Sequence, residues 1–488
     1  MPNNVRPCIG PGDSGYDKGR IISNARFDYH PASICYCSSD IEVLKVLDTA
    51  APGRLRIRSG GHQHEGMCSG DGVTILDVSK FDEIRIDGDV LTVGPGARLR
   101  DVYKKLWSAR RLLPGGGCGD VCVGGLVQGG GWSPYSRALG LTCDVLLGFR
   151  IILANGTIMD VERDEAGADP CLFWAVAGGG GGNFGVVTQF RFKLATLTGP
   201  ITSFTVSWDE PGFYIRVMED WRSHFPDHPD HRLTSFCRLT AVADVGSTDS
   251  PVIVAGFFLG EVGEIKGMLP GLLPETWSGR SNFSSSPVDT APEGQRAFQH
   301  PEYQPGPPAE AVHAAAGLAG AASADLGSTC AGDPFPHKVS SCYPRAEFGS
   351  AEVRRLAQYL MNSGYEPTAR RYLSLMSLGG AVRNENDRSC FAYREKPYLM
   401  QYQAWWADTN PNSGVSRRCL AWVAGFRDTM QPHVDGSFIN FPDRDLPAAD
   451  RKALLRYYYR GNLERLIGIK ARYDPRKVFD FPMGIPTS

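Results

Sequence analysis

The sequence predicts an α+β fold whose first part interleaves short strands and helices and whose second part is rich in strands. Between residues 21 and 160, strand-like runs alternate with helix-like runs. The dipeptides DG at 87–88 and NG at 155–156 are hairpin-turn signals, so some of these strands are expected to be antiparallel. Around residues 198–205 the pattern changes to longer apolar runs. This arrangement differs from the regular strand-helix alternation of a doubly wound nucleotide-binding sheet.

The elements of the first part can be placed by their residue patterns. Helices are expected at 39–50, with Ser39 or Asp40 as the N-cap, and at 99–111. The predicted strands, which are short and rich in β-branched residues, are 54–59, 72–78, 83–96 (with its turn) and 146–161 (with its turn).

Beyond residue 198 the predicted elements are strands first and helices last. The strand-like runs are ITSFTVSW (201–208), VIVAGFFLG (252–260), TARRYLSLMSL (368–378) and PYLMQYQAWW (397–406). The segment 448–474 has helical character and is ended by Pro475, because proline cannot continue a helix.

Bulk composition excludes several classes of protein. The chain has 488 residues, 42% of them hydrophobic, which is enough for a large core and argues against disorder. The net charge is -2 and no long basic run occurs, so no nucleic-acid partner is expected. No segment has the roughly 20 apolar residues of a membrane helix, and the first 20 residues lack the apolar core of a signal peptide, which predicts a cytoplasmic protein without membrane attachment.

Cysteine usage gives no sign of a structural metal or a disulfide framework. The 13 cysteines are an odd number in a long chain, so a complete set of disulfides is not expected. No CxxC pair occurs, and no metal site is predicted.

Three segments are unusually rich in glycine: RSGGHQHEG (58–66), PGGGCGDVCVGGLVQGGGW (114–132) and AGGGGGNFGVV (177–187). Glycine permits positive φ and lets a ligand approach main-chain N–H groups. Three such loops in one chain indicate a large anionic cofactor with a pyrophosphate, although each could be an ordinary turn. None has the GxxxxGK[ST] pattern, and a GxGxxG spacing within a glycine run is a weak signal, so neither a phosphate loop nor a nicotinamide site is favoured.

These segments, read together, resemble the berberine-bridge-enzyme-like family of FAD-linked oxidases, within the p-cresol methylhydroxylase and vanillyl-alcohol oxidase superfamily. The resemblance covers residues 20–190 and 430–488 and only patches between them. Besides the glycine-rich loops, it rests on FINF (438–441), YYRGN (458–462) and RYDP (472–475).

The resemblance implies a two-part FAD-binding domain of the p-cresol methylhydroxylase type and a substrate domain with an antiparallel sheet backed by helices. The first part of the FAD domain would be residues 1–197 and the substrate domain 198–434. Residues 435–488 would form a berberine-bridge-like segment that returns to the FAD domain.

The resemblance also implies FAD held by two covalent bonds, an 8α-histidyl bond from His62 and a 6-S-cysteinyl bond from Cys118. A neutral imidazole and a thiolate are suitable nucleophiles for such bonds. Cys122 lies four residues away, but the motif favours Cys118. The backbone N–H groups of Ser59, Gly60, Gly61 and Gln63 would hold the pyrophosphate. The other cofactor contacts implied are Arg58, Val121, Gly124, Gly125, Gly131, Ser136, Gly185, Val187 and Asn440.

The chain departs from the family at its usual catalytic base. The second tyrosine of the family's YxNY motif is Phe441 here, and the first is Phe438. Phenylalanine cannot accept a proton, so another group does this, or the substrate needs no strong base, or the flavin serves a cyclisation without net oxidation. The alternative groups are Tyr402, Gln401, Gln403, Tyr372 and nearby histidines, of which only the tyrosines and histidines titrate usefully.

The predicted function is an O2-dependent oxidase that transfers a hydride from a small molecule to FAD and releases H2O2. Trp405, Phe438 and Phe441 predict an apolar pocket for an aromatic or hydrophobic specialised metabolite. In relatives, a valine at the position of Val121 accompanies reaction with O2. Two alternatives remain, a carbohydrate or oligosaccharide oxidase and a flavin-carrying binding protein with little turnover. The sequence predicts no oligomeric state.

Overall fold

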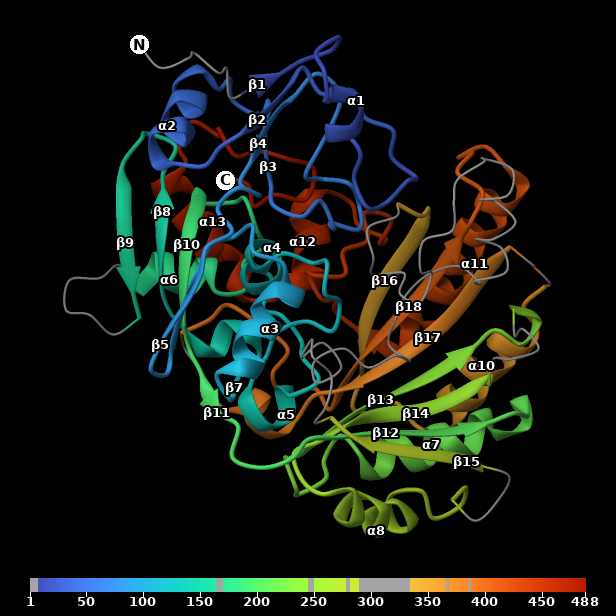
Figure 1. Ribbon diagram of the computed structural model, residues 1–488. Helices are drawn as coiled ribbons and strands as arrows, with labels where there is room; N and C mark the ends of the chain where they lie inside the picture. Colours follow the sequence, from blue (N-terminus) through green and yellow to red (C-terminus); the bar gives the residue numbers. More distant parts are fainter. Residues whose placement is uncertain are drawn as a thin grey trace.

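The computed structural model describes residues 8–163, 170–244, 250–277, 281–288, 334–364, 366, 368–384 and 388–488. These residues form an α+β fold, as predicted, with smaller sheets in the first part of the chain and one large antiparallel sheet in the second (Figure 1). The last 50 residues pack back against the first part, where α13 contacts α6.

The first part contains a four-stranded sheet of order β1-β2-β4-β3 and a five-stranded sheet of order β5-β6-β10-β8-β9. The pairs β2-β4 and β3-β4 are parallel, whereas all pairs of the five-stranded sheet are antiparallel. The strands are β1 Cys8–Ile9, β2 Ser33–Tyr36, β3 Leu55–Arg58, β4 Thr74–Asp77, β5 Ile84–Asp87, β6 Val90–Val93, β8 Leu146–Ile152, β9 Ile158–Glu162 and β10 Val186–Lys193, with the small pair β7 Arg111–Leu112 and β11 Ala195–Thr196.

The elements predicted for this part are confirmed within a few residues. The helix α2, Asp40–Thr49, begins after Ser39, whose hydroxyl accepts a hydrogen bond from the N–H of Glu42 and so caps the helix. Both predicted hairpins occur, β5-β6 and β8-β9. The other helices of this part are α1 Tyr16–Gly19, α3 Leu99–Ser108, α4 Val123–Gln128, α5 Ser136–Leu139 and α6 Pro170–Val176.

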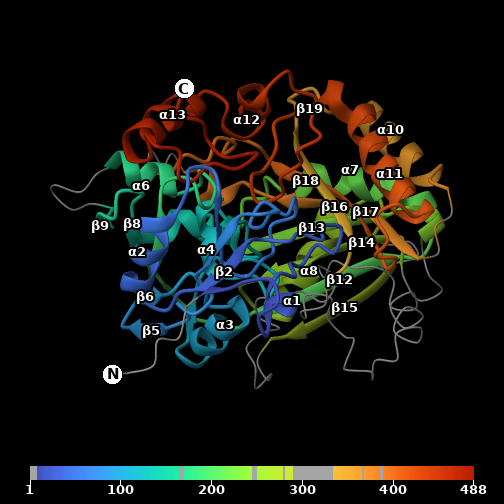
Figure 2. The same ribbon diagram turned by 90° about the horizontal axis from the view of Figure 1, so that it is seen from above.

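The second part is built on an eight-stranded antiparallel sheet of order β15-β12-β14-β13-β17-β18-β16-β19. Its strands are β12 Thr202–Trp208, β13 Leu233–Thr240, β14 Val252–Phe258, β15 Ser281–Pro287, β16 His337–Pro344, β17 Ala369–Ser377, β18 Tyr398–Trp406 and β19 Val434–Asp435. The helices α7 Tyr214–His224, α8 Val262–Leu272, α10 Ser350–Met361 and α11 Gly414–Met430 complete this part. Figures 1 and 2 show α7, α10 and α11 together on one face of this sheet, so the opposite face is turned toward the first part of the chain.

Side-chain alternation along β18 separates the two faces of the sheet. Met400, Tyr402 and Trp406 belong to the core cluster that includes the helices α7, α10 and α11. Gln401, Gln403 and Trp405 lie on the opposite face. The whole strand is buried, which explains why its sequence is apolar on one face and mixed on the other.

The C-terminal segment contains two helices, α12 Arg451–Tyr459 and α13 Asn462–Tyr473, and α13 lies beside α6 (Figure 2). Arg460, with φ of 48°, separates them. Lys470 is almost fully buried and donates to the carbonyl of Phe479 (2.7 Å) and to the carboxylate of Asp474 (2.7 Å). Its third bond, to the carbonyl of Asn183 (2.5 Å), ties this segment to the third glycine-rich loop. The domain limits at 197/198 and 434/435 stay predictions.

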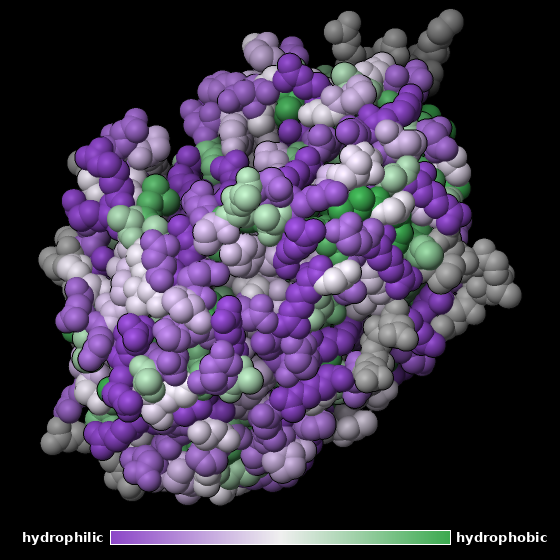
Figure 3. Space-filling model, turned by 180° about the vertical axis from the view of Figure 1, so that it is seen from behind, coloured by the Kyte–Doolittle hydropathy of each residue, from purple (hydrophilic) through white to green (hydrophobic). Residues whose placement is uncertain are grey.

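The surface in Figure 3 is mainly hydrophilic, with hydrophobic side chains only in small groups. Among the described residues, no helix is long and apolar enough to cross a membrane.

Candidate active site

A cavity of about 450 Å³ lies between the glycine-rich loops and the free face of the eight-stranded sheet. All three glycine-rich segments contribute to its wall, through Gly60 and Gly61, through Gly124 and Gly125, and through residues 180–182. Sequence reasoning expected these loops to surround one ligand, and the structure brings them to one cavity.

The loop after β3 presents a row of main-chain donors. Gly61 has φ of 72°, a conformation that glycine adopts without strain. Among the described residues, no backbone N–H from residue 59 to residue 62 donates a hydrogen bond to another backbone group, whereas that of Gln63 bonds to the sulfur of Cys68. Buried N–H groups are normally paired, and successive free N–H groups form a nest for an anion. The predicted pyrophosphate contacts Ser59, Gly60, Gly61 and Gln63 all line the cavity beside these donors.

Two further glycines leave room that a side chain would fill. A Cβ added to Gly125, on α4, would meet nothing within 4 Å, although Gly125 lines the cavity. A Cβ on Gly181 would meet only Gln128 and the backbone of Gly125, at 3.7 Å or more. The open space beside these glycines and the row of donors fit a large cofactor with a pyrophosphate, as FAD is.

His62 lies at the wall of the cavity with its imidazole neutral. Burial lowers the pKa of His62 to about 4, and the nearby Arg98 and Arg100 act in the same direction. Its Nδ1 is 2.9 Å from the carbonyl oxygen of Gly60. A neutral imidazole retains a nucleophilic nitrogen, which is what formation of a histidyl bond requires.

Cys118 and Cys122 both line the cavity, but they differ in state. Cys122 is a free, buried thiol that donates to the carbonyl of Gly96, and burial raises its pKa to about 12. Such a thiol is a poor nucleophile. Cys118 is less buried and its sulfur is held in a disulfide in this structure. A second disulfide, Cys8–Cys35, joins β1 to β2.

Most of the other predicted cofactor contacts line the cavity, and three do not. Those that do are Val121, Gly124, Gly125, Gly185, Val187 and Asn440. Arg58 points away and pairs with Asp77 (2.6 Å). Gly131 has φ of 80°, and an added Cβ would meet Thr142. Ser136 accepts from the N–H of Ser133 within a turn (2.8 Å). These three residues stabilise the loops that form the site.

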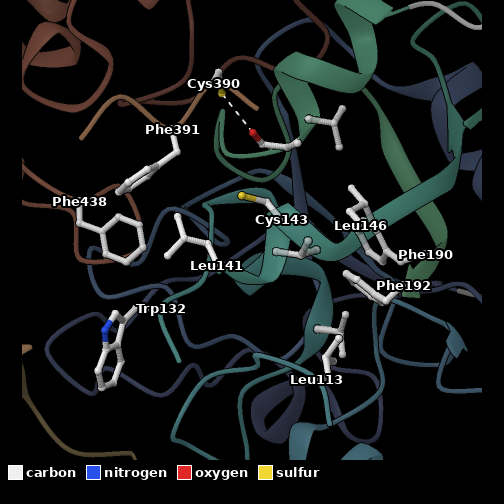
Figure 4. Close-up of a cluster of buried hydrophobic side chains, with 14 of the residues drawn as sticks. Leu113, Trp132, Leu141, Cys143, Leu146, Phe190, Phe192, Cys390, Phe391 and Phe438 are labelled. Atoms are coloured by element: carbon white, nitrogen blue, oxygen red, sulfur yellow. Dashed lines mark hydrogen bonds between the residues drawn. The ribbon is translucent and has the colours of Figure 1, made fainter. Parts of the chain in front are cut away.

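An aromatic wall faces the glycine-rich loops. Phe438, Phe441 and Trp405 line the cavity, as predicted for the substrate pocket, and so does Trp132. Figure 4 shows Phe391, Phe438 and Trp132 on the same side of the buried cluster. The ring of Phe438 meets those of Phe391 and Phe441 edge to face, at centroid distances of 5.7 and 5.4 Å.

Of the predicted polar candidates, Gln401 and Gln403 line the cavity and Tyr402 and Tyr372 do not. The amide of Gln403 donates to Gln401 (3.2 Å) and accepts from the indole N–H of Trp405 (2.8 Å). The hydroxyl of Tyr402 is on the helix-covered face, where it accepts from Ser340 (2.8 Å). Burial raises the pKa of Tyr402 well above its ordinary value. Its position, set by strand alternation, therefore gives no support to a role as catalytic base.

Two histidines complete the wall, and sequence reasoning did not identify them individually. His64 and His337 both line the cavity, and Nδ1 of His64 is 3.0 Å from Nε2 of His337. His337 also stacks on Trp405, with ring centroids 3.9 Å apart. The only sequence signal was a second histidine two residues after His62, because His337 is 273 residues from His64 along the chain.

Free main-chain donors, an open glycine cradle and a neutral histidine in one cavity define a flavin-binding oxidoreductase of α+β fold. Two family models match the chain, one of an FAD binding domain at residues 31–162 and one described as berberine and berberine like at residues 437–486. An uncharacterized FAD-linked oxidoreductase, YgaK from Bacillus subtilis, is 28% identical over 97% of this chain and 95% of its own. Together these matches support a berberine-bridge-enzyme-like FAD-linked oxidase.

Two further comparisons point to the same family. Glucooligosaccharide oxidase from Sarocladium strictum is 27% identical over 98% of this chain and 93% of its own. A solved structure of glucooligosaccharide oxidase from Acremonium strictum, described as carrying 6-S-cysteinyl, 8α-N1-histidyl FAD, superposes with a TM-score of 0.82. It is 22% identical and covers 99% of this chain and 97% of its own, so this likeness concerns the fold.

Proposed function

We propose that the protein is an O2-dependent oxidase with bicovalently attached FAD that oxidises a small aromatic or hydrophobic metabolite and releases H2O2. The observation that carries the proposal is that His62, Cys118 and the unbonded N–H groups of residues 59–62 border one cavity. Bound FAD supplies a two-electron acceptor. The chain's own residues anchor it, exclude water with an aromatic wall and position the substrate.

Attachment through Cys118 requires its thiolate. A sulfur in a disulfide cannot at the same time bond to a flavin, so the disulfide state of Cys118 and the flavin-bonded state exclude each other. His62 is already suited to forming its bond, because burial keeps its imidazole neutral.

The substrate class follows from the side chains that line the cavity. Trp132, Trp405, Phe438 and Phe441 offer rings for stacking, and only Gln401 and Gln403 add polar side chains from β18. Sugars usually need many polar contacts besides stacking. An aromatic or hydrophobic substrate therefore fits better, and the alternative is an oligosaccharide, which the relative from Sarocladium strictum and the two glutamines favour.

Attachment is tested by acid precipitation and peptide mapping of the purified protein. Wild type should keep its yellow colour in the pellet and yield one flavin peptide that joins the fragments of His62 and Cys118. His62→Ala and Cys118→Ala should each keep one bond. Cys122→Ala is the matched control, because Cys122 lines the same cavity but has a pKa of about 12, and it should keep both bonds.

Release of free FAD from the wild type would contradict the attachment. Oxidase activity is tested separately by H2O2 production with a panel of phenols, aromatic alcohols, amines and oligosaccharides. Turnover of oligosaccharides alone would favour the alternative, and no H2O2 with any compound would favour a flavin-carrying binding protein.

A further inference from the structure

The two histidines of the cavity wall form a chain of hydrogen bonds whose direction can be assigned. The carbonyl oxygen of Phe335 is 2.9 Å from Nδ1 of His337 and can only accept, so Nδ1 of His337 carries the proton. Nε2 of His337 is then an acceptor, and His64 donates to it from Nδ1. Nε2 of His64 is left with a lone pair and has no hydrogen-bond partner among the described residues.

Four contacts hold this pair in place. The side chain of Asn24, fully buried, donates to the carbonyl oxygens of both His64 (2.7 Å) and His337 (3.0 Å). It also accepts from the N–H of His337 (3.1 Å). The next residues along the chain, Glu65 and Lys338, form a buried ion pair of 2.6 Å. These contacts fix the backbone of both histidines, so the distance between their rings is set by the fold.

The pair lies beside the position where the family carries its tyrosine base. The ring centroids of His64 and Phe441 are 5.8 Å apart, and His64 is partly exposed to the cavity. His337 is buried and stacked on Trp405, whose indole is fixed by Gln403. An imidazole with a free lone pair therefore borders a phenylalanine that cannot accept a proton.

From this geometry we propose that the His64–His337 pair is the proton acceptor of the oxidation, with Nε2 of His64 taking the proton and His337 as a positioning residue. The inference rests on the proposed oxidase function. The substrate's O–H or N–H bond breaks and its proton goes to Nε2 of His64. With FAD bound, the C–H bond would break and its hydrogen would leave with the electron pair to the flavin, so that the substrate gains a C=O or C=N bond. O2 would then take up these two electrons together with two protons, the one held on Nε2 of His64 and the one that left carbon as hydride, to give H2O2.

Burial keeps the imidazole of His64 neutral at pH 7, so its Nε2 can accept a proton. Burial lowers the pKa of His64 to about 4 and holds that of His337 well below its ordinary value. The titratable groups near the pair are the neutral His62 on its own loop and three cations, Arg26 on the N-terminal segment, Lys338 on β16 and Arg444 on the C-terminal segment. Glu65 pairs with all three cations, at 2.6 to 3.2 Å, so they oppose protonation of the pair only weakly.

The first test reads the tautomers directly. In protein labelled with ¹⁵N-histidine, His64 and His337 should both be neutral with the proton on Nδ1 at pH 7. In His337→Phe, which keeps a ring against Trp405 but removes the acceptor, the His64 signals should lose the shifts that the bond to His337 causes. A proton on Nε2 of His64 in the wild type would overturn the proposal whatever the enzyme turns over.

The second test measures the rate of flavin reduction under anaerobic conditions, with a compound found to reduce the wild type. His64→Gln should lower the rate constant about 10²–10⁴-fold at pH 7, since a general base contributes this much. His64→Gly should regain part of the rate with added imidazole, a rescue that a purely structural role would not give. His224→Gln, at the end of α7 and away from the cavity, is the matched histidine control.

A loss of less than threefold in His64→Gln, or no rescue of His64→Gly by imidazole, would overturn the proposal. If the proposed oxidase function itself is wrong, the experiments give a different result. In that case no compound of the panel reduces the flavin of the wild type, while the tautomer of His64 is still measured.

Discussion

Phe438 and Phe441 stand where the family carries tyrosines, and both line the cavity. Phe441 contacts Phe438 edge to face and lies beside His64. It also packs against the small cluster of Val339, Tyr372 and Trp405. The described neighbours of Phe441 are therefore mainly aromatic, and His64 is the one among them to which the proposal assigns proton transfer.

Restoring the tyrosine should not restore a lost function. We expect Phe441→Tyr to leave the rate of anaerobic flavin reduction unchanged or lower, because the new hydroxyl enters an apolar wall at a cost of about 1–3 kcal/mol if it finds no partner. The measurement is that rate against pH for both proteins. A hundredfold rise with a new pH dependence would show that the wild type lacks its base and would contradict the role of His64.

Val121 is expected to control access of O2. It lines the cavity, three residues after Cys118, and is only partly buried. Val121→Leu should slow reoxidation of the reduced flavin at least tenfold, because the added methylene group fills the space beside the ring, and should change reduction by substrate much less. Stopped-flow reoxidation at several O2 concentrations decides this, with Val121→Ala as the control that should keep the wild-type rate. Equal rates for Val121→Leu and wild type would exclude Val121 as the gate.

Among the individual residues of the site, those within contiguous sequence motifs could be predicted from the sequence. The role of the loop of residues 58–63 could be predicted, because a pyrophosphate is bound by consecutive main-chain N–H groups. The role of Cys118 could be predicted from the short motif around it. The pairing of His64 with His337 could not be predicted, since it depends on how β16 meets the loop after β3. Tyr402 was a candidate on chemical grounds alone, and strand alternation places it on the other face.

At the scale of elements, the short helix α4 illustrates how a site constrains sequence. Its Gly125 has open space where a side chain would extend into the cavity, while Gly124 packs so closely that a Cβ would meet Pro95 at 2.8 Å. Gly124 is therefore required by packing within the protein, whereas Gly125 leaves space for the proposed cofactor. Each glycine in a helix lowers its stability by about 1 kcal/mol relative to alanine. At Gly125 this loss keeps space open in the cavity.

Gly125→Leu should separate cofactor binding from folding. We expect the variant to fold, because nothing lies within 4 Å of the added Cβ and leucine favours helix, but to lose most of its bound flavin. Gly468→Leu is the matched control, since Gly468 lies on α13, also has open space at its Cβ and is exposed on the surface. Flavin content per protein and the far-ultraviolet circular dichroism are measured for both. Full flavin content in Gly125→Leu would show that the cradle is not occupied by the cofactor.

The individual strands could be predicted, but the order of the large sheet could not. Runs of β-branched and aromatic residues identified β12, β14, β17 and β18 because a buried strand has a local signature. The order β15-β12-β14-β13-β17-β18-β16-β19 depends on pairings between distant segments, for which one sequence has no signal. Only the family resemblance supplied an antiparallel sheet backed by helices, and the structure confirms it.

For the whole molecule, a buried cluster of charges joins the two parts of the chain below the histidine pair. Nζ of Lys338, on β16, is 2.6 Å from Glu65 of the glycine-rich loop, 2.5 Å from Asp443 of the C-terminal segment and 2.8 Å from Asp445. Lys338 and Asp443 are almost fully buried. Opposite charges hold the pKa of Asp443 below its ordinary value, although its burial alone would raise it. The cluster fixes the loop, the sheet and the C-terminal segment against one another at the site.

The neutral histidines of the cavity should make the whole protein less stable in mild acid. Burial lowers the pKa of His64 to about 4, whereas a histidine in the unfolded chain has a pKa of about 6.5. Between these values the unfolded chain binds protons that the folded chain does not, so the stability contributed above pH 6.5 is lost as the pH falls toward 4. His337 acts in the same direction, and Asp220 and Asp244, whose pKa values burial raises, act in the opposite one.

A comparison of variants therefore isolates the effect of the pair. From pH 7.5 to pH 5, the free energy of unfolding should fall by about 1 kcal/mol less in His64→Gln than in wild type, after allowance for the partial exposure of His64 to the cavity. His224→Gln should keep the wild-type dependence, because His224 lies outside the cavity at the end of α7. The measurement is denaturant unfolding of the three flavin-loaded proteins at several pH values. Parallel curves for wild type and His64→Gln would mean that the imidazole of His64 is hydrated and titrates normally in the folded protein, and the acceptor proposed for the reaction would then be charged in mild acid.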